Sequence, residues 1–241
     1  MIKIAMWSGP RNISTALMRS FENRPDTYVS DEPFYAHYLH ITKKKHPMYK
    51  EIIHYGDTNW NSVVKNITGN IPYNKEVWYQ KHMAQHNLEN KNLNWINKMK
   101  NIFLIRNPKE VILSYIKKNS LINILELGYI QQVELVKKIE EEFGIVPVII
   151  DSQDLLKNPK YILTKLCKKC NISFYDQMLL WPKGPRKTDG IWSKYWYVNV
   201  ENSTRFSPYI KNKSTLPMQY KNIYLDCMNY YTELYKKRIK L

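Results

Sequence analysis

The chain has 241 residues, 44% of them hydrophobic, which suits a globular protein with a substantial core and excludes a disordered one. Three cysteines are too few for a disulfide scaffold, and we find neither a leader nor an apolar run of the ~20 residues that span a membrane, so we predict a cytoplasmic protein. The net charge of +16 comes largely from scattered lysines, so no specific nucleic-acid partner is predicted, although the charge would favour a polyanionic ligand.

The first stretch of the chain predicts a phosphate-binding loop. Residues 1–7 are mostly apolar, residues 8–15 hold glycine, proline, arginine and hydroxyl side chains, and residues 16–21 are again apolar-periodic, which indicates a strand, a loop and a helix. An anion fits at a helix N-terminus, where N–H groups lack partners. Ser14 and Thr15 could cap the helix and donate to phosphate oxygens, and Arg11 matches a phosphate or sulfate edge. The alternative is a plain turn with a capped helix.

The next region contains a turn, a short strand and an acidic pair. Residues 23–26 predict the turn, residues 27–30 the strand, and Asp31 and Glu32 follow it. Residues 34–68 are mostly helical in pattern, and we expect an insertion at about 34–70 that faces the substrate of one domain spanning residues 1–241. Its histidines lack the spacing of a metal site, so no metal is expected.

Two further strands end in charged residues. Residues 76–82 predict a strand that ends at Lys81 and His82, and residues 101–105 predict one that ends at Arg106. Asn107 is a good N-cap and Pro108 a good first helical residue, so a helix should begin at once and place Ser114 in its second turn. Arg106 and Ser114 can then bind one phosphate together.

These two loop-and-helix stretches resemble the nucleotide motifs of the sulfotransferase family. Residues 10–17 are similar to its 5′-phosphosulfate loop and residues 102–115 to its 3′-phosphate motif. The resemblance implies a three-layer P-loop α/β fold with a central parallel sheet flanked by helices. It also implies transfer of a sulfuryl group from 3′-phosphoadenosine 5′-phosphosulfate (PAPS) to a hydroxyl or amine of a small acceptor. Ile13 stands where the family usually has glycine, so the loop could be wider or the donor different.

The resemblance also implies roles for individual residues. Glu32, before Pro33, is similar to a glutamate on the acceptor side, and the pair Lys81 and His82 is similar to the segment that carries the family's catalytic histidine. Either Glu32 or His82 could take the acceptor's proton, and the sequence leaves that choice open. Lys81 would stabilise charge on the bridging oxygen as the donor's phosphate leaves, and Arg11 is expected to be a catalytic residue as well. The residues expected to bind the cofactor PAPS are Gly9, Pro10, Arg11, Asn12, Ile13, Ser14, Thr15, Arg106, Ser114, Arg186, Lys187 and Trp192.

The last three of these residues belong to a cationic loop at residues 181–192. It is similar, loosely, to the family's late segment that folds over the nucleotide, so Arg186 and Lys187 could neutralise the 3′-phosphate and Trp192 could stack on a base. Before it, residues 128–143 predict a helix, residues 145–150 a buried strand and residues 160–170 another helix. Cys167 and Cys170 lie in this last helix, where we expect a structural role.

Two other functions remain open at this point. A kinase or hydrolase on the same scaffold would need Mg²⁺ and an acidic ligand near the loop, for which Asp151 is the candidate. A non-catalytic module that binds nucleotide or nucleic acid would rely on the positive charge. The lysine of the Walker pattern is absent, which disfavours an ordinary ATPase or GTPase. The sequence names neither the acceptor nor the oligomeric state.

Overall fold

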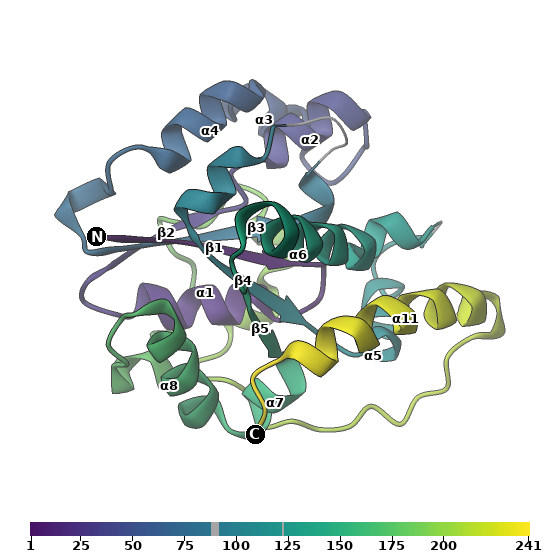
Figure 1. Cartoon of the computed structure of the whole chain (residues 1–241). Helices are drawn as coiled ribbons and strands as arrows, with labels where there is room; N and C mark the ends of the chain where they lie inside the picture. Colours follow the sequence, from purple (N-terminus) through teal and green to yellow (C-terminus); the bar gives the residue numbers. More distant parts are fainter. Residues whose placement is uncertain (88–91, 122) are drawn as a thin grey trace.

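The computed structural model of the chain describes residues 1–87, 92–121 and 123–241. A parallel sheet with the strand order β2-β3-β1-β4-β5 crosses its centre (Figure 1). The strands are β1 (Ile2–Ser8), β2 (Thr27–Asp31), β3 (Val77–Met83), β4 (Lys100–Ile105) and β5 (Val148–Asp151). All five confirm strands expected from the sequence, although β5 begins later than residue 145. Because the strands are parallel, their carboxyl ends, with the charged residues that follow them, lie at one edge.

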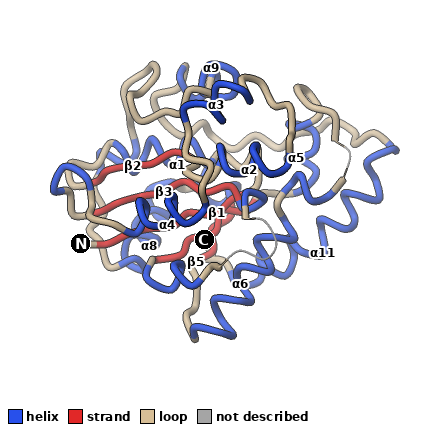
Figure 2. The backbone as a smooth tube through the Cα atoms, turned by 90° about the horizontal axis from the view of Figure 1, so that it is seen from above, coloured by secondary structure: helices blue, strands red, loops and turns tan. Residues whose placement is uncertain are grey.

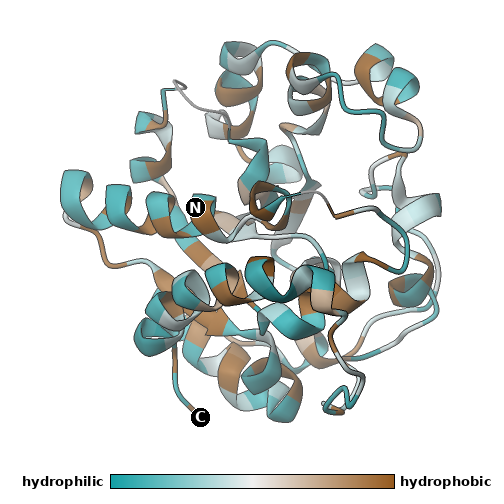
Figure 3. Ribbon diagram, turned by 90° about the vertical axis from the view of Figure 1, so that its right-hand side faces the viewer, coloured by the Kyte–Doolittle hydropathy of each residue, from teal (hydrophilic) through white to brown (hydrophobic). Residues whose placement is uncertain are grey.

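Helices cover both faces of the sheet, which confirms the three-layer α/β prediction. One face packs against α1 (Ser14–Glu22) and α8 (Pro159–Cys170), and the other against α4 (Trp60–Thr68), α6 (Tyr129–Phe143) and α11 (Lys221–Lys237). In β1, Ile4 and Met6 pack in the first core, whereas Ala5 and Trp7 pack in the second. This two-sided burial explains why β1 is almost continuously apolar. In Figure 3 the strands are largely brown, the colour of hydrophobic residues, whereas the helices carry both brown and teal, hydrophilic residues.

The segment expected to be a helical insertion forms three helices, α2 (Tyr35–Thr42), α3 (Tyr49–Tyr55) and α4. They lie together above the sheet in Figure 1. Their side chains divide between the two cores, because Leu39 and Ile52 pack in the first and Trp60 packs in the second. The helical prediction is confirmed, and the segment is joined to the rest of the fold by both cores.

The remaining elements connect these layers. They are α5 (Pro108–Tyr115), α7 (Ser152–Lys157), α9 (Ser193–Trp196), α10 (Val198–Glu201) and short 3₁₀ helices at Pro72–Asn74, Ala84–His86, Asn94–Lys98, Ile124–Leu127, Asp176–Leu179 and Met218–Tyr220. In the view of Figure 2, α9 and α3 project onto the same side of the molecule. Across the described part of the chain, no helix has both the length and the apolar character needed to cross a bilayer.

Cys167 and Cys170 are buried in α8 and pack in the first core. Burial raises the pKa of the Cys167 thiol to about 11 and that of Cys170 to about 12, so both stay protonated at neutral pH. Their packing agrees with the structural role expected from the sequence.

Asp151 caps α7 and is held away from solvent. Its carboxylate accepts hydrogen bonds from the backbone N–H of Gln153 (2.8 Å) and from the hydroxyl of Tyr231 (2.9 Å), and it is 1% exposed. Burial raises the pKa of Asp151 to about 6. The folded protein therefore holds this proton more tightly than the unfolded chain, and the resulting stabilisation is lost as the pH rises through about 6.

We therefore expect Asp151→Asn to stabilise the protein only where Asp151 is ionised. Asparagine is an equally good N-cap and carries no buried charge. At about pH 8 the variant should gain roughly 1–2 kcal/mol in free energy of unfolding, and below about pH 4 it should gain nothing. Urea unfolding at both pH values measures this difference. A difference that is the same at both would show that charge burial is not the cause.

Candidate active site

The loop after β1 forms a cradle at the N-terminus of α1. Ile13 is the N-cap residue, with no side-chain hydrogen bond to the helix, and the helix begins at Ser14. The N–H groups of its first turn therefore have no partner from a capping side chain. Asn12 holds the loop to β4 by donating to the Leu104 carbonyl (3.2 Å). Ser14 and Thr15 are helical residues and not caps, which corrects that part of the expectation, and the geometry suits an anion.

Ile13 adopts the backbone conformation that glycine would adopt freely. Its φ is 60°, and Arg11 in the same loop has φ 63°. For a β-branched residue this left-handed conformation is strained, at a cost of about 1–2 kcal/mol. The isoleucine in place of the usual glycine therefore leaves the loop with a glycine-like backbone.

We expect Ile13→Gly to preserve nucleotide binding and Ile13→Pro to abolish it. Glycine accepts the positive φ, whereas the proline ring fixes φ near −65° and would refold the loop. Calorimetry with 3′-phosphoadenosine 5′-phosphate (PAP) should give an affinity within about threefold of wild type for the glycine variant and a loss of more than tenfold for the proline variant. Equal binding by both variants would contradict the importance of this backbone conformation.

Two arginines join the cradle to the second phosphate motif. Arg11 Nε donates to the Ser114 hydroxyl (3.0 Å), and Arg106 Nη1 donates to the Arg11 carbonyl (2.9 Å). Glu110 accepts from Arg106 Nε (3.0 Å). The pKa of Arg11 is lowered by burial and by the nearby charge of Arg106. Two partly buried guanidinium groups so close together are stabilised by a bound anion.

The helix that carries Ser114 begins as the sequence predicts. Arg106 follows the last residue of β4, and Asn107 is the N-cap of α5, with its side chain accepting from the Lys109 N–H (3.0 Å). Pro108 is the first helical residue, a position at which its missing N–H costs nothing. Ser114 consequently lies one and a half turns into α5 and faces Arg11.

Beside the cradle, charged side chains at the carboxyl ends of β2 and β3 form a buried cluster. Lys81 Nζ lies 2.8 Å from Asp31 Oδ1 and 2.6 Å from Glu32 Oε1. The hydroxyl of Tyr197 lies 2.6 Å from the same nitrogen. Lys81 and Asp31 side chains are 1% exposed and that of Glu32 is 12% exposed, so Glu32 is the carboxylate with access to solvent.

Burial acts in opposite directions on the two partners. It raises the pKa of Glu32, and the nearby Asp31 charge adds to this, although Lys81 works against it. Burial alone would lower the pKa of Lys81, but the Asp31 and Glu32 carboxylates outweigh it and hold that pKa well above the usual value. Lys81 is therefore charged, and Glu32 is a carboxylate of increased basicity.

A cavity of about 500 Å³ connects these features. Ten of the residues expected at the site line it: Pro10, Arg11, Asn12, Ile13, Ser14, Thr15, Glu32, Lys81, Arg106 and Ser114. Gly9 does not line it but supports it, since a Cβ at this position would lie 2.1 Å from the Leu127 carbonyl oxygen. The cavity thus has a cationic end at the loop, and Glu32 and Lys81 line it beside that end.

Comparison with known proteins identifies the family. A family model described as a sulfotransferase domain matches residues 2–238, nearly the whole chain. The chain belongs to the sulfotransferase family.

Two relatives from Arabidopsis thaliana are similar in sequence to this member of the sulfotransferase family. They are named branched-chain-amino-acid aminotransferase-like proteins 1 and 2 and are 35% and 33% identical to it over 217 and 231 residues. These matches cover 90% and 96% of the chain but 39% and 41% of the relatives. The chain therefore spans about two fifths of the length of the curated relatives it matches.

Solved structures share the fold at low sequence identity. The sulfotransferase domain from the Synechococcus PCC 7002 olefin synthase has a TM-score of 0.57 and 14% identity, with 100% of this chain and 96% of that chain covered. A sulfotransferase from Alicyclobacillus acidocaldarius has a TM-score of 0.51 and 11% identity, with 98% and 94% covered. At these identities the likeness shows the fold alone.

His82 does not line the cavity of this sulfotransferase-family chain. Its ring stacks on Trp7 with centroids 4.5 Å apart, and its Nε2 lies 3.2 Å from Gln80 Oε1. Side chains alternate along a strand, so Lys81 and His82 face opposite sides of the sheet. Burial also lowers the pKa of His82 to about 3. The geometry therefore does not support His82 as the base, which corrects one of the two expected candidates.

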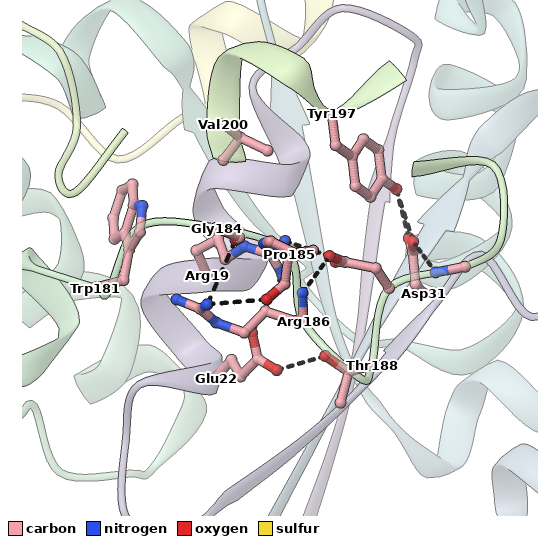
Figure 4. Close-up of polar contacts among 12 residues, drawn as sticks. Arg19, Glu22, Asp31, Trp181, Gly184, Pro185, Arg186, Thr188, Tyr197 and Val200 are labelled. Carbon is pink, nitrogen blue, oxygen red and sulfur yellow. Dashed lines mark hydrogen bonds and ion pairs between the residues drawn. The ribbon is translucent and has the colours of Figure 1, made fainter. Parts of the chain in front are cut away.

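The loop at residues 181–192 is likewise placed differently from the expectation. Arg186 donates to the Pro182 carbonyl and lies 3.6 Å from Glu22 of α1, Lys187 is exposed, and Trp192 is buried in the first core. None of these three described residues lines the cavity, so the structure does not bring them to the cradle. Figure 4 shows Arg186 and Thr188 against Arg19 and Glu22 of α1.

Several residues that line the cavity were not found by sequence reasoning. Arg205 and Ser207 follow the 181–192 loop and supply a cation and a hydroxyl, and Tyr197 reaches the cavity between α9 and α10. His86 lines the wall with its ring between Tyr35 (4.9 Å) and Tyr38 (4.5 Å). The only signal for the later residues was an aromatic, irregular stretch at residues 193–206, which fixes no register.

Proposed function

We propose that the chain transfers a sulfuryl group from PAPS to a hydroxyl or amine of a small acceptor. The observation that carries this proposal is the direct contact between the two phosphate motifs, Arg11 to Ser114 and Arg106 to the Arg11 carbonyl, in the same cavity as Glu32. A ligand with anionic groups at two positions fits this arrangement better than one with a single anionic end.

The residues present fit PAPS. The first turn of α1 and Arg11 would hold the 5′-phosphosulfate, and Arg106 and Ser114 would hold the 3′-phosphate. PAPS supplies the sulfuryl group. The lowered pKa of Arg11, which burial and the charge of Arg106 produce, supports the fit because a bound anion offsets both effects.

Glu32 is the proposed base. Its carboxylate lines the cavity beside the cradle, and burial raises its pKa, so it can accept a proton from an acceptor hydroxyl. Lys81 donates to Glu32 from behind (2.6 Å) and is placed to stabilise negative charge that develops near the transferred group. His86, Tyr35 and Tyr38 would line the acceptor end, which supports a small acceptor with an aromatic or polar surface.

The acidic ligand that the sequence offered for the kinase alternative does not line the cavity. Asp151, the candidate from the sequence, caps α7 and accepts from Tyr231 instead of lining the cavity. The described residues contain no cluster of three or more histidine, cysteine or acidic side chains arranged for a metal. Within residues 1–87, 92–121 and 123–241, no particular contact favours the nucleic-acid module over the enzyme.

Calorimetric titration of the purified protein tests the proposal. PAP should bind without Mg²⁺, and ADP and ATP should bind more weakly because they lack the 3′-phosphate. A screen of alcohols, phenols and amines with radiolabelled PAPS would then identify the acceptor. Preference for Mg·ATP would instead favour a kinase, and binding of oligonucleotides alone with steep salt dependence would favour the nucleic-acid module.

A further inference from the structure

A buried hydrogen-bond network lies directly behind Glu32, and Tyr197 is its centre. The hydroxyl oxygen of Tyr197 is 2.6 Å from Lys81 Nζ and 2.9 and 2.7 Å from the two oxygens of Asp31. Trp192 Nε1 donates to the same hydroxyl (3.3 Å). Figure 4 shows the phenol of Tyr197 pointing at Asp31. Tyr197 is 4% exposed, so water cannot easily replace its hydroxyl.

The donors and acceptors of this network match in number. An ammonium group has three N–H donors, and the structure provides three acceptors for Lys81: Asp31, Glu32 and Tyr197. The single O–H of Tyr197 goes to Asp31, which also accepts from the backbone N–H of Gly190 (3.1 Å). With two donors held by Asp31 and Tyr197, the third N–H of Lys81 is left for Glu32, the remaining acceptor among the described residues.

We propose that Tyr197 is a positioning residue whose hydroxyl holds Lys81 in the one orientation that directs its third N–H at Glu32. The inference rests on the proposed function to the extent that Glu32 is the base. It deepens that function because it assigns a role to a residue outside both phosphate motifs. Tyr197 acts on Glu32 through Lys81, and its hydroxyl also lowers the pKa of Glu32 directly, but it need not contact the reacting atoms.

Tyr197 belongs to a segment that is firmly attached to α1. We call residues 181–201 the strap. Within it, Asp189 pairs with the buried Arg19 (2.6 Å), and Thr188 donates to Glu22. Since α1 also carries the phosphate cradle, one helix supports both the anion site and the strap that delivers Tyr197. The position of the Tyr197 hydroxyl is therefore fixed relative to the loop that binds the nucleotide.

The groups that act on Glu32 come from four elements. They are Asp31 at the end of β2, Lys81 on β3, Tyr35 on α2 and Tyr197 between α9 and α10. Removing the Tyr197 hydroxyl takes a donor from Asp31, which then attracts Lys81 more strongly and draws it from Glu32. Glu32 would lose part of the positive charge that stabilises its ionised form, and it would also lose the hydroxyl that lowers its pKa directly, so its pKa should rise further.

Carbon-13 NMR of glutamate-labelled protein tests this directly, because it follows the titration of Glu32 without any substrate. The Glu32 signal is identified by its loss in Glu32→Gln. In Tyr197→Phe we expect its midpoint to move to higher pH while PAP affinity stays within about threefold of wild type. With an acceptor, turnover should fall about tenfold or more, and its acid limb should move in the same direction.

The matched control is Tyr231→Phe. Tyr231 also donates a buried phenol hydrogen bond to an aspartate, Asp151 (2.9 Å), but it lies outside the cavity. This variant should leave the Glu32 midpoint and turnover unchanged, whatever it does to stability. The control therefore separates loss of a buried tyrosine hydroxyl in general from loss of this one.

An unchanged or lowered Glu32 midpoint in folded Tyr197→Phe would overturn the proposal. If that variant does not fold, the wild type still provides a test, because an ammonium group with three buried acceptors exchanges its protons slowly. A slowly exchanging nitrogen-15 signal that is present in the wild type and disappears in Lys81→Arg supports the network. If the wild type shows no such signal, the proposal is overturned. If wild type fails to bind PAP but the Glu32 midpoint shifts as expected, the proposed donor is wrong and the positioning role remains.

Discussion

Arg106→Ala should weaken PAP binding about 100-fold, close to 3 kcal/mol. The substitution removes a guanidinium proposed to bind the 3′-phosphate, and it also takes the donor at 2.9 Å from the Arg11 carbonyl. Glu110 would lose its cationic partner and keep only the Tyr209 hydroxyl (2.8 Å), so its negative charge beside the site would disfavour the ligand. Calorimetry with PAP measures the loss, and binding of ADP should change less because ADP has no 3′-phosphate.

Two variants make this result specific. Arg106→Lys keeps the charge but not the two-pronged geometry, so we expect an intermediate loss. Arg238→Ala removes an arginine that is also paired with a carboxylate, Asp154 (2.7 Å), but outside the cavity, and it should bind PAP as wild type does. Equal PAP affinity in wild type and Arg106→Ala would remove Arg106 from the site and weaken the case for a 3′-phosphate.

The parts of the site that the sequence predicted are those fixed by local backbone geometry. A strand followed at once by a capped helix must place Arg106 at the strand end and Ser114 in the second turn, wherever the rest of the chain goes. The loop at residues 9–15 could be predicted for the same reason, because its residues are consecutive in the chain and lie at the N-terminus of one helix. Parallel strands then bring both segments to the same edge of the sheet.

The sequence-based predictions that the structure does not support concern residues whose positions depend on tertiary packing. Lys81 and His82 are adjacent on β3, so only one of them can face the cavity, and a shift of one residue exchanges them. The strap has neither strand nor helix periodicity to fix its course, and its ion pairs with Arg19 and Glu22 determine where it lies. Those contacts turn Arg186 toward α1 and deliver Tyr197 to the cavity, and no spacing in the sequence records them.

Glu32→Gln should lower turnover by about 100- to 1,000-fold and leave PAP affinity within about threefold of wild type. Glutamine keeps the shape and can still accept from Lys81 but cannot take a proton. Because Glu32 acts only when ionised, wild-type turnover should fall as the pH drops through its pKa, which burial raises. The acid limb of turnover should therefore lie above the ordinary range of a glutamate, and the acceptor found with radiolabelled PAPS allows its measurement.

Asp154→Asn provides the control, since Asp154 is also a buried carboxylate with a cationic partner but lies outside the cavity. Its turnover should match wild type. If Glu32→Gln remains fully active instead, the base must be another group that faces the acceptor, and His86 is the obvious one. Burial raises the pKa of Glu32 but holds that of His86 well below its usual value. The same desolvation strengthens the carboxylate as a base and weakens the imidazole, so the physical chemistry of the cavity favours Glu32.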